Sequence, residues 1–191
     1  MATKYIVNNV TGQTINGQQV QPYKVYTALL TQSGGSDVLF IGSDDIHPLV
    51  IGVTYTITLN FGDADFTNVG APNNNLGTSF VATGTIPNSW GTPGENQVSY
   101  NTGAPVVTVL ENTIGNISFA YFAIGTYIIN SNSLFTTNKF ALFMGNMVTE
   151  ADVNISCEYS NNSTVYMNVV QANNSADGEL TNTPIEIRVY N

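Results

Sequence analysis

The pattern of apolar and polar positions along the chain predicts a protein built from short β-strands. Between residues 104 and 146, apolar and aromatic residues recur at every second position, most clearly in segments 106–111, 117–123 and 139–144. Several of these segments are apolar at both sets of alternate positions. They are expected to bury both faces, in a sandwich core or against a neighbouring subunit. The residues that this pattern selects for packing or for an interface are Val107, Val109, Phe119, Tyr121, Phe122, Phe140 and Phe143.

Alternation of the same kind continues outside the central stretch. Residues 23–35 predict a strand that ends in a pair of glycines, and residues 53–61 alternate apolar side chains with threonine and asparagine. Residues 151–191 predict three further strands. Turn signals separate these segments, and no segment predicts a helix of ordinary length. The chain is therefore predicted to be all-β, with a β-sandwich or jelly-roll-like domain.

The order of the segments predicts a second, small β unit inserted at a hairpin of the main domain. The N-terminal arm carries the pair Asn16-Gly17, which is typical of a type I′ hairpin turn. Its sequence leaves open whether the arm pairs with its own domain or with the open edge of a neighbour. The expected divisions are an arm over 1–22, a main sandwich over 23–35 plus 103–191, and an inserted unit over 36–102.

The amino-acid composition excludes some classes of binding partner. Charged residues make up 9% of the chain, against about 25% in typical soluble domains, and the net charge is −9 with four Lys and Arg residues in total. So few cations exclude phosphate-backbone recognition, and we expect no nucleic-acid partner. No apolar run approaches the roughly 20 residues needed to cross a bilayer, and the first residues lack the apolar stretch of a signal peptide. We therefore expect no membrane partner and assembly in a host cytoplasm.

Candidate catalytic residues are scarce. The chain has one histidine, His47, and one cysteine, Cys157, which excludes a disulfide within the chain. We interpret His47 as a turn residue and Cys157 as a core residue. No pair of the thirteen acidic residues stands out as a glycosidase pair, and adjacent Asp44 and Asp45 are expected to be solvated or to cap a turn. The chain is predicted to be no enzyme and to need no cofactor.

Two further features suggest binding. Asp63 and Asp65 stand two residues apart in a predicted loop, where alternate oxygen ligands are able to hold Ca²⁺. The favoured alternative is that both aspartates make Asx turns. Trp90, the single tryptophan, is a candidate for stacking on a sugar ring, although a tryptophan between two prolines more often caps a small core.

Two segments of the main domain resemble a known viral module. YKVYTALLTQSGG at 23–35 and APVVTVLENTIGNISFAYFAIGTYIINSNSLFTTNKFALFMGN at 104–146 are similar to a β-rich module of tailed bacteriophages of Bacteroidetes hosts, including crAss-like phages. In that module the two segments are nearly continuous, whereas here residues 36–103 separate them. The intervening IGVTYTITLNFGDADFTNVGAPNNNLGTSFVATGTIPNSWG resembles a small phage-associated β unit. Neither resemblance carries a catalytic residue.

The resemblance implies a structural component of the virion. We expect an auxiliary or decoration protein on the capsid, or a head-fibre component, that acts by subunit assembly. Its partners would be the major capsid protein or tail and fibre proteins, and copies of itself. A trimer is the arrangement expected of a fibre or threefold decoration protein. The alternatives are a tail or tail-fibre component, or a carbohydrate-binding adhesin module that contacts the host surface.

Overall fold

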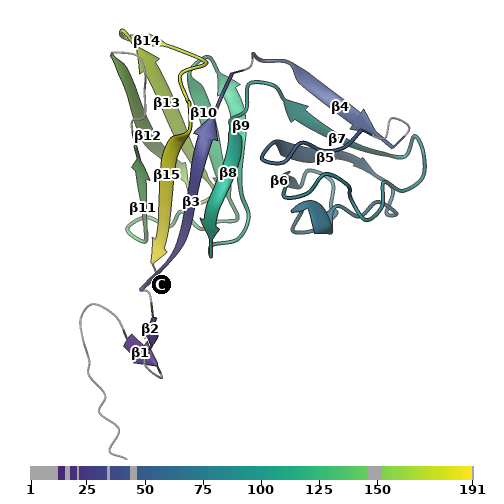
Figure 1. Ribbon diagram of the computed structural model, residues 1–191, viewed down its shortest axis with the longest axis horizontal. Helices are drawn as coiled ribbons and strands as arrows, with labels where there is room; N and C mark the ends of the chain where they lie inside the picture. Colours follow the sequence, from purple (N-terminus) through teal and green to yellow (C-terminus); the bar gives the residue numbers. More distant parts are fainter. Residues whose placement is uncertain are drawn as a thin grey trace, which may run out of the picture.

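The computed structural model is an all-β protein, as the sequence predicts (Figure 1). Its described residues form three antiparallel sheets of four or five strands and one two-stranded sheet. The helical element among the described residues is a single 3-10 turn, η1 (Thr67–Val69). No helix in the described part of the chain is long and apolar enough to cross a membrane. The structure describes residues 13–15, 18–20, 22–33, 35–43, 47–145 and 152–190.

The main domain is a sandwich of two sheets (Figure 1). In the first sheet the strand order is β11 (Phe140–Met144), β15 (Thr183–Tyr190), β3 (Tyr23–Thr31) and β8 (Val106–Asn112). In the second it is β12 (Val153–Asn161), β13 (Thr164–Gln171), β10 (Thr126–Ser131) and β9 (Ile117–Ala123), with β14 (Asn174–Ser175) paired to β13. Neighbouring strands are antiparallel throughout.

The sandwich core forms where alternate side chains of the two sheets meet. On β3 the inward positions are Tyr26, Ala28 and Leu30, each almost fully buried, and their neighbours along the strand are half-buried. This alternation is the one that the sequence of residues 23–31 predicts. The rings of Tyr26 and Phe119 meet across the sandwich with centroids 6.3 Å apart. The remaining large core side chains come from β10, β13, β15 and a loop: Tyr127, Ile129, Val165, Met167, Val169, Ile185, Ile187 and Phe135.

The predicted insertion is present as a separate four-stranded sheet. Its strand order is β4 (Val38–Gly42), β7 (Asn96–Asn101), β5 (Thr54–Asn60) and β6 (Ser79–Val81). These strands follow β3 and precede β8, although β3 and β8 are direct neighbours in the sandwich. The sheet projects beside the sandwich and has its own core, built around Tyr55, Ile57, Phe66, Phe80 and Val98 (Figure 1). We call residues 38–101 the inserted unit.

The N-terminal arm is described only in part. Strands β1 (Gln13–Ile15) and β2 (Gln18–Val20) pair antiparallel, with Ile15 opposite Gln18. The predicted turn at Asn16-Gly17 and residues 1–12 lie outside the described residues, as do Asp44 and Asp45. Whether the arm reaches a neighbouring subunit stays a prediction.

One expectation about burial is wrong, and another is met only in part. Strands β8 and β11 do not bury both faces within the chain, because β8 buries Val107 alone and β11 buries no side chain fully; burial against a neighbouring subunit, the other alternative, stays a prediction. Both are edge strands, so each has a partner strand on one side only. Cys157, expected in the core, is exposed. It lies on edge strand β12, where burial ends after Ile155.

Candidate functional site

Many of the exposed apolar side chains lie on strands at the edges of sheets, and others lie in loops. On β4 three consecutive residues, Val38, Leu39 and Phe40, are exposed by 52%, 44% and 58%. Among the described strands β4 pairs only with β7, so one row of its backbone N–H and C=O groups faces outward. Natural β proteins usually protect such an edge with charge, proline or a cover. Strand β4 carries no charged residue.

The outer face of the sheet β11-β15-β3-β8 is also largely apolar. Leu110 and Phe143 are exposed by 63% and 51%, and both line a shallow groove of about 520 Å³ across this face. We call this face the outer apolar face. Its side chains, which alternate with the core positions, are Val106, Thr108, Leu110, Glu111, Val25, Thr27, Leu29, Thr31, Pro184, Glu186, Arg188, Ala141 and Phe143.

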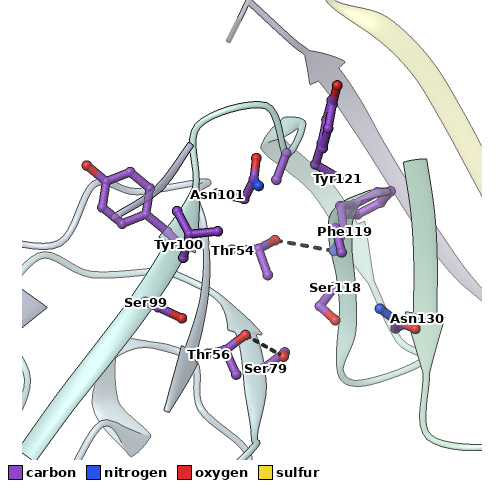
Figure 2. A pocket seen from close by; sticks show the side chains of 13 residues that line it. Thr54, Thr56, Ser79, Ser99, Tyr100, Asn101, Ser118, Phe119, Tyr121 and Asn130 are labelled. Carbon is purple, nitrogen blue, oxygen red and sulfur yellow. Dashed lines mark hydrogen bonds between the residues drawn. The ribbon is translucent and has the colours of Figure 1, made fainter. Parts of the chain in front are cut away.

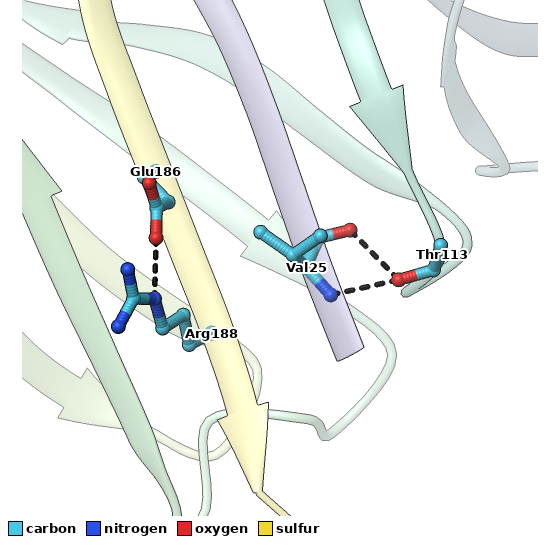
Figure 3. A network of polar contacts seen from close by, with 4 residues as sticks. All are labelled: Val25, Thr113, Glu186 and Arg188. Atoms are coloured by element: carbon cyan, nitrogen blue, oxygen red, sulfur yellow. Dashed lines mark hydrogen bonds and ion pairs between the residues drawn. The ribbon is translucent and has the colours of Figure 1, made fainter. Parts of the chain in front are cut away.

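Two charged side chains of the outer apolar face, Arg188 and Glu186, pair with each other. Arg188 donates a hydrogen bond through Nε to Glu186 Oε1, two residues along β15 (Figure 3). The guanidinium carbon lies 4.8 Å from the centroid of the Tyr23 ring and 5.1 Å from that of Phe143. The hydrogen bond to Glu186 raises the pKa of Arg188 further, so the guanidinium stays charged at every ordinary pH. A pair that is already neutralised and flanked by rings suits a surface that another subunit covers.

Hydrogen bonds hold β8 at both ends, one set to β3 and one bond to the inserted unit. Just beyond β8, Thr113 accepts a hydrogen bond from Val25 N at 2.8 Å and donates one to Val25 O at 3.1 Å (Figure 3). At the start of β8, Val107 N donates to Gly52 O of the inserted unit at 2.8 Å. Among the described residues, strand β4 makes no comparable bonds on its open side.

A polar groove lies between the inserted unit and the sandwich. The threonine face of β5 turns toward β9, where Phe119 N donates to Thr54 Oγ1 at 3.3 Å (Figure 2). Asn116 Nδ2 donates to Ser79 O at 2.9 Å, which joins the two units a second time. Between these contacts lies a cleft of about 240 Å³. An adjoining depression of about 680 Å³ shares Ser79, Ser118 and Asn130 with it, and we call the two together the inter-unit groove.

The lining of the inter-unit groove is polar and uncharged. No Asp, Glu, Lys, Arg or His of the described residues lines either part of it. Ser118 is 3% exposed, yet its hydroxyl makes no hydrogen bond with another described residue, and the same holds for the side chains of Ser99 and Asn130. The hydroxyl and amide residues of the lining are Thr54, Thr56, Asn73, Thr78, Ser79, Ser99, Asn101, Asn116, Ser118, Asn130, Ser131 and Asn132.

Tyr121 lines one end of the cleft, and its ring points away from Thr56, Ser99 and Ser118 (Figure 2). Its hydroxyl donates to Asp177 Oδ2 at 3.0 Å, and Tyr127 donates to the other carboxylate oxygen of Asp177 at 2.9 Å. Desolvation and the hydrogen bond to Asp177 raise the pKa of Tyr121. Gly103 lies against the Tyr121 ring so closely that a Cβ there would come within 2.6 Å of it. The ring is therefore held in one position.

The two aspartates proposed for calcium serve as hydrogen-bond acceptors inside the inserted unit. Asp63 Oδ2 accepts from Thr92 N at 2.7 Å and from Thr92 Oγ1 at 2.6 Å, and Asp63 Oδ1 accepts from Asn96 Nδ2 at 2.7 Å. These bonds, with those of Thr92 dominant, lower the pKa of Asp63. The carboxylate thus ties the loop after β5 to the turn before β7, 29 residues away.

Asp65 makes the Asx turn that the sequence favours. Its Oδ1 accepts from Thr67 N at 2.9 Å and Thr67 Oγ1 at 2.6 Å, while Asn88 and Asn74 donate their amides to the same carboxylate. The bonds from Thr67 and Asn88 hold the pKa of Asp65 well below its usual range. Both carboxylates therefore face donors, whereas a calcium ion is surrounded by oxygen acceptors. No group of three or more His, Cys, Asp or Glu in the described ranges is arranged to hold a metal ion.

Trp90 lies inside the core of the inserted unit. It is 9% exposed, and its ring meets that of Phe66 edge-on, with centroids 5.4 Å apart and an interplanar angle of 86°. A sugar ring needs an open aromatic face, so the position of Trp90 does not support stacking on a glycan. The alternative that the sequence offers, a cap on a small core, fits this burial.

The seven residues selected from the sequence for packing or interface divide by strand position. Val107 and Phe119 are in the sandwich core. Tyr121 and Phe140 are half-buried. Val109, Phe122 and Phe143 are exposed by 39%, 59% and 51%.

Sequence reasoning missed the exposed residues of β4, because the apolar run 38–41 by itself predicts only a short strand. The two candidate catalytic residues lie in different units. His47 is exposed in the inserted unit, whereas Cys157 is on β12 of the sandwich.

Comparison with known proteins identifies no relative of this chain. No protein-family model matches the chain, and no curated protein or solved structure matches it either.

Proposed function

We propose that the protein is a structural subunit of a bacteriophage particle that acts by assembly. The observation that carries the proposal is the uncovered edge strand β4, with Val38, Leu39 and Phe40 exposed on it. A soluble monomer gains nothing from such an edge, whereas a neighbouring strand would pair with its backbone and bury its side chains.

The outer apolar face supports the same proposal. Its one described ion pair, Glu186 with Arg188, is neutral as a unit, while Glu111, opposite Thr27 on edge strand β8, adds one negative charge to the face. A surface rich in short uncharged side chains also loses little rotamer entropy when it is covered. The proposal that this particle is a phage rests on the resemblance of residues 23–35 and 104–146 to a phage module.

Within the particle we favour an auxiliary or decoration protein of the capsid, or a head-fibre component. The sequence shows no fixed repeat or heptad of a long fibre. A tail or tail-fibre position is the second candidate. Partners would be the major capsid protein or tail proteins, together with further copies of this chain.

Quantitative mass spectrometry of purified virions tests the proposal. The copy number relative to the major capsid protein is the measured quantity. Hundreds of copies per particle support a capsid-lattice role, and a dozen or a few tens support a vertex, collar or tail role. Absence of the protein from purified particles would overturn the proposal.

A further inference from the structure

We propose that the inter-unit groove binds an uncharged saccharide. The proposal rests on the groove's own chemistry and does not depend on where the protein sits in a particle. Sugars are recognised by hydroxyl and amide groups that both donate and accept hydrogen bonds, together with an apolar or aromatic surface against the ring face. The groove offers these groups and, among the described residues, no charged side chain.

Several polar side chains at the cleft have hydrogen-bond donors and acceptors that no described residue uses. Ser118 and Asn130 are cross-strand partners on β9 and β10, and Ser99 faces them from β7 of the inserted unit (Figure 2). None of the three side chains bonds to another described residue. Ser118 is 3% exposed as a residue, but its hydroxyl is not one of the fully buried unpaired atoms, so it can be reached from the cleft. A ligand hydroxyl in the cleft would satisfy it.

The remaining walls are fixed in advance. Thr56 Oγ1 and Ser79 Oγ are hydrogen-bonded to each other at 2.8 Å, and Thr54 is held by Phe119 N. Tyr121, held by Asp177, lines one end of the cleft. A site that is rigid before the ligand arrives loses less entropy on binding.

Size and charge select the class of ligand. The cleft of about 240 Å³ is smaller than the roughly 300–1,000 Å³ of pockets for drug-sized molecules, so it suits a single sugar ring. The adjoining depression, lined by Asn73, Asn116 and Asn132, would accept the next residue of a chain. A protein of net charge −9 with no cation in the described lining disfavours acidic sugars.

Saturation-transfer NMR on the full chain tests the proposal. The probes are glucose, galactose, mannose, N-acetylglucosamine and their disaccharides, with N-acetylneuraminic acid as the charged probe. We expect transfer to at least one uncharged probe and none to the acid. Transfer to no uncharged probe at millimolar concentration, or transfer to the acid alone, would overturn the proposal.

Variants then locate the binding. Ser118→Ala combined with Asn130→Ala removes two free hydrogen-bonding groups, and Ser99→Gln fills the cleft from the opposite wall. We expect each to weaken binding about tenfold or more. The matched control is Ser156→Ala combined with Asn168→Ala, a cross-strand Ser–Asn pair in the same sheet but outside the groove, and it should bind normally. Unchanged binding by both groove variants, or equal loss in the control, would contradict the assignment.

Discussion

Two buried tyrosine hydroxyls in the sandwich core have opposite surroundings. Tyr26 OH is buried and has no hydrogen-bond partner among the described residues, and this burial raises the pKa of Tyr26. Tyr127 OH donates to Asp177 at 2.9 Å. The two rings are both almost fully buried, so they form a matched pair.

We predict that Tyr26→Phe leaves the free energy of unfolding unchanged or raises it by up to about 1 kcal/mol, because it removes an unsatisfied polar group. Tyr127→Phe should lower the free energy of unfolding by about 1–3 kcal/mol, because it leaves a partly buried carboxylate with one donor fewer. Urea denaturation of both variants measures the difference. Equal destabilisation by the two substitutions would show that Tyr26 has a partner after all.

The aspartates of the inserted unit predict how stability depends on pH. Hydrogen bonds lower the folded-state pKa of Asp63 and Asp65, so the unfolded state binds protons first as the pH falls. Their stabilising effect is complete at neutral pH, begins to fade near the unfolded pKa of about 4 and is lost as the pH falls through the lower folded values.

Asp65→Asn should therefore flatten the fall of the melting temperature between about pH 7 and pH 3. The comparison is with the unsubstituted protein and with Asp152→Asn, an exposed aspartate of the sandwich, as the control. Thermal denaturation followed by circular dichroism gives the melting temperatures. A slope for Asp65→Asn as steep as that of the unsubstituted protein would contradict the role of this carboxylate.

At the scale of elements, the inserted unit is attached to the sandwich through Gly52. Its φ of 87° lies in the left-handed region, and its carbonyl accepts from Val107 N at 2.8 Å. A Cβ at Gly52 would collide with the Val107 carbonyl oxygen. Gly62 also has a positive φ, of 102°, but a Cβ there would meet no atom within 4 Å. A substitution at Gly62 therefore measures the cost of backbone strain alone, and a substitution at Gly52 adds the cost of the collision.

Gly62→Ala should cost about 1–2 kcal/mol of unfolding free energy through φ alone. Gly52→Ala should cost roughly 1 kcal/mol or more beyond that, because the β8 edge must move away from the inserted unit. Urea denaturation of the two variants gives both values. Equal costs would mean that the close contact between Gly52 and β8 does not stabilise the protein.

Elements are predictable from the sequence where alternation is strong. Residues 23–31, 54–60, 117–123 and 183–190 form strands close to their predicted positions, because a period of two in apolar residues leaves few alternatives. Strand β7 is not predicted: its sequence NQVSYN offers only Val98 and Tyr100 as apolar positions, and its first residues are typical of a turn. Pairing with both β4 and β5 decides its structure.

Sequence patterns do not predict the inter-unit groove. Thr54 and Thr56 alternate with core residues, which predicts a polar face but not what that face meets. The groove exists because this face turns toward β9, where the partner of Thr54 is 65 residues away in sequence. Likewise, Asp63 and Asp65 are recognisable as a pair, but their donors Thr92 and Asn88 come from a distant loop.

At the scale of the whole molecule, uncovered strand edges predict assembly. Phe40→Lys places a charge on the β4 edge, where another subunit would have to bury it at a cost of several kcal/mol. The isolated subunit should fold with an unchanged melting temperature, because Phe40 is exposed. Incorporation into particles should fall about tenfold or more, measured by co-purification with virions.

Ile86→Lys is the matched control for this substitution. Ile86 is exposed by 69% in a loop of the same unit, so a lysine there adds the same charge away from the sheet edge. Its incorporation should equal that of the unsubstituted protein. Equal incorporation of Phe40→Lys and Ile86→Lys would show that β4 is not part of the interface.

Hydrogen exchange of β4 in the free subunit and in the purified particle tests the central claim most directly. The claim is that a neighbouring subunit covers this edge. Free edge amides exchange fast, whereas amides paired to a neighbouring strand are protected. We predict that peptides covering residues 38–42 exchange at least about tenfold more slowly in the particle than in the free subunit. The same rate in both states would contradict assembly through β4.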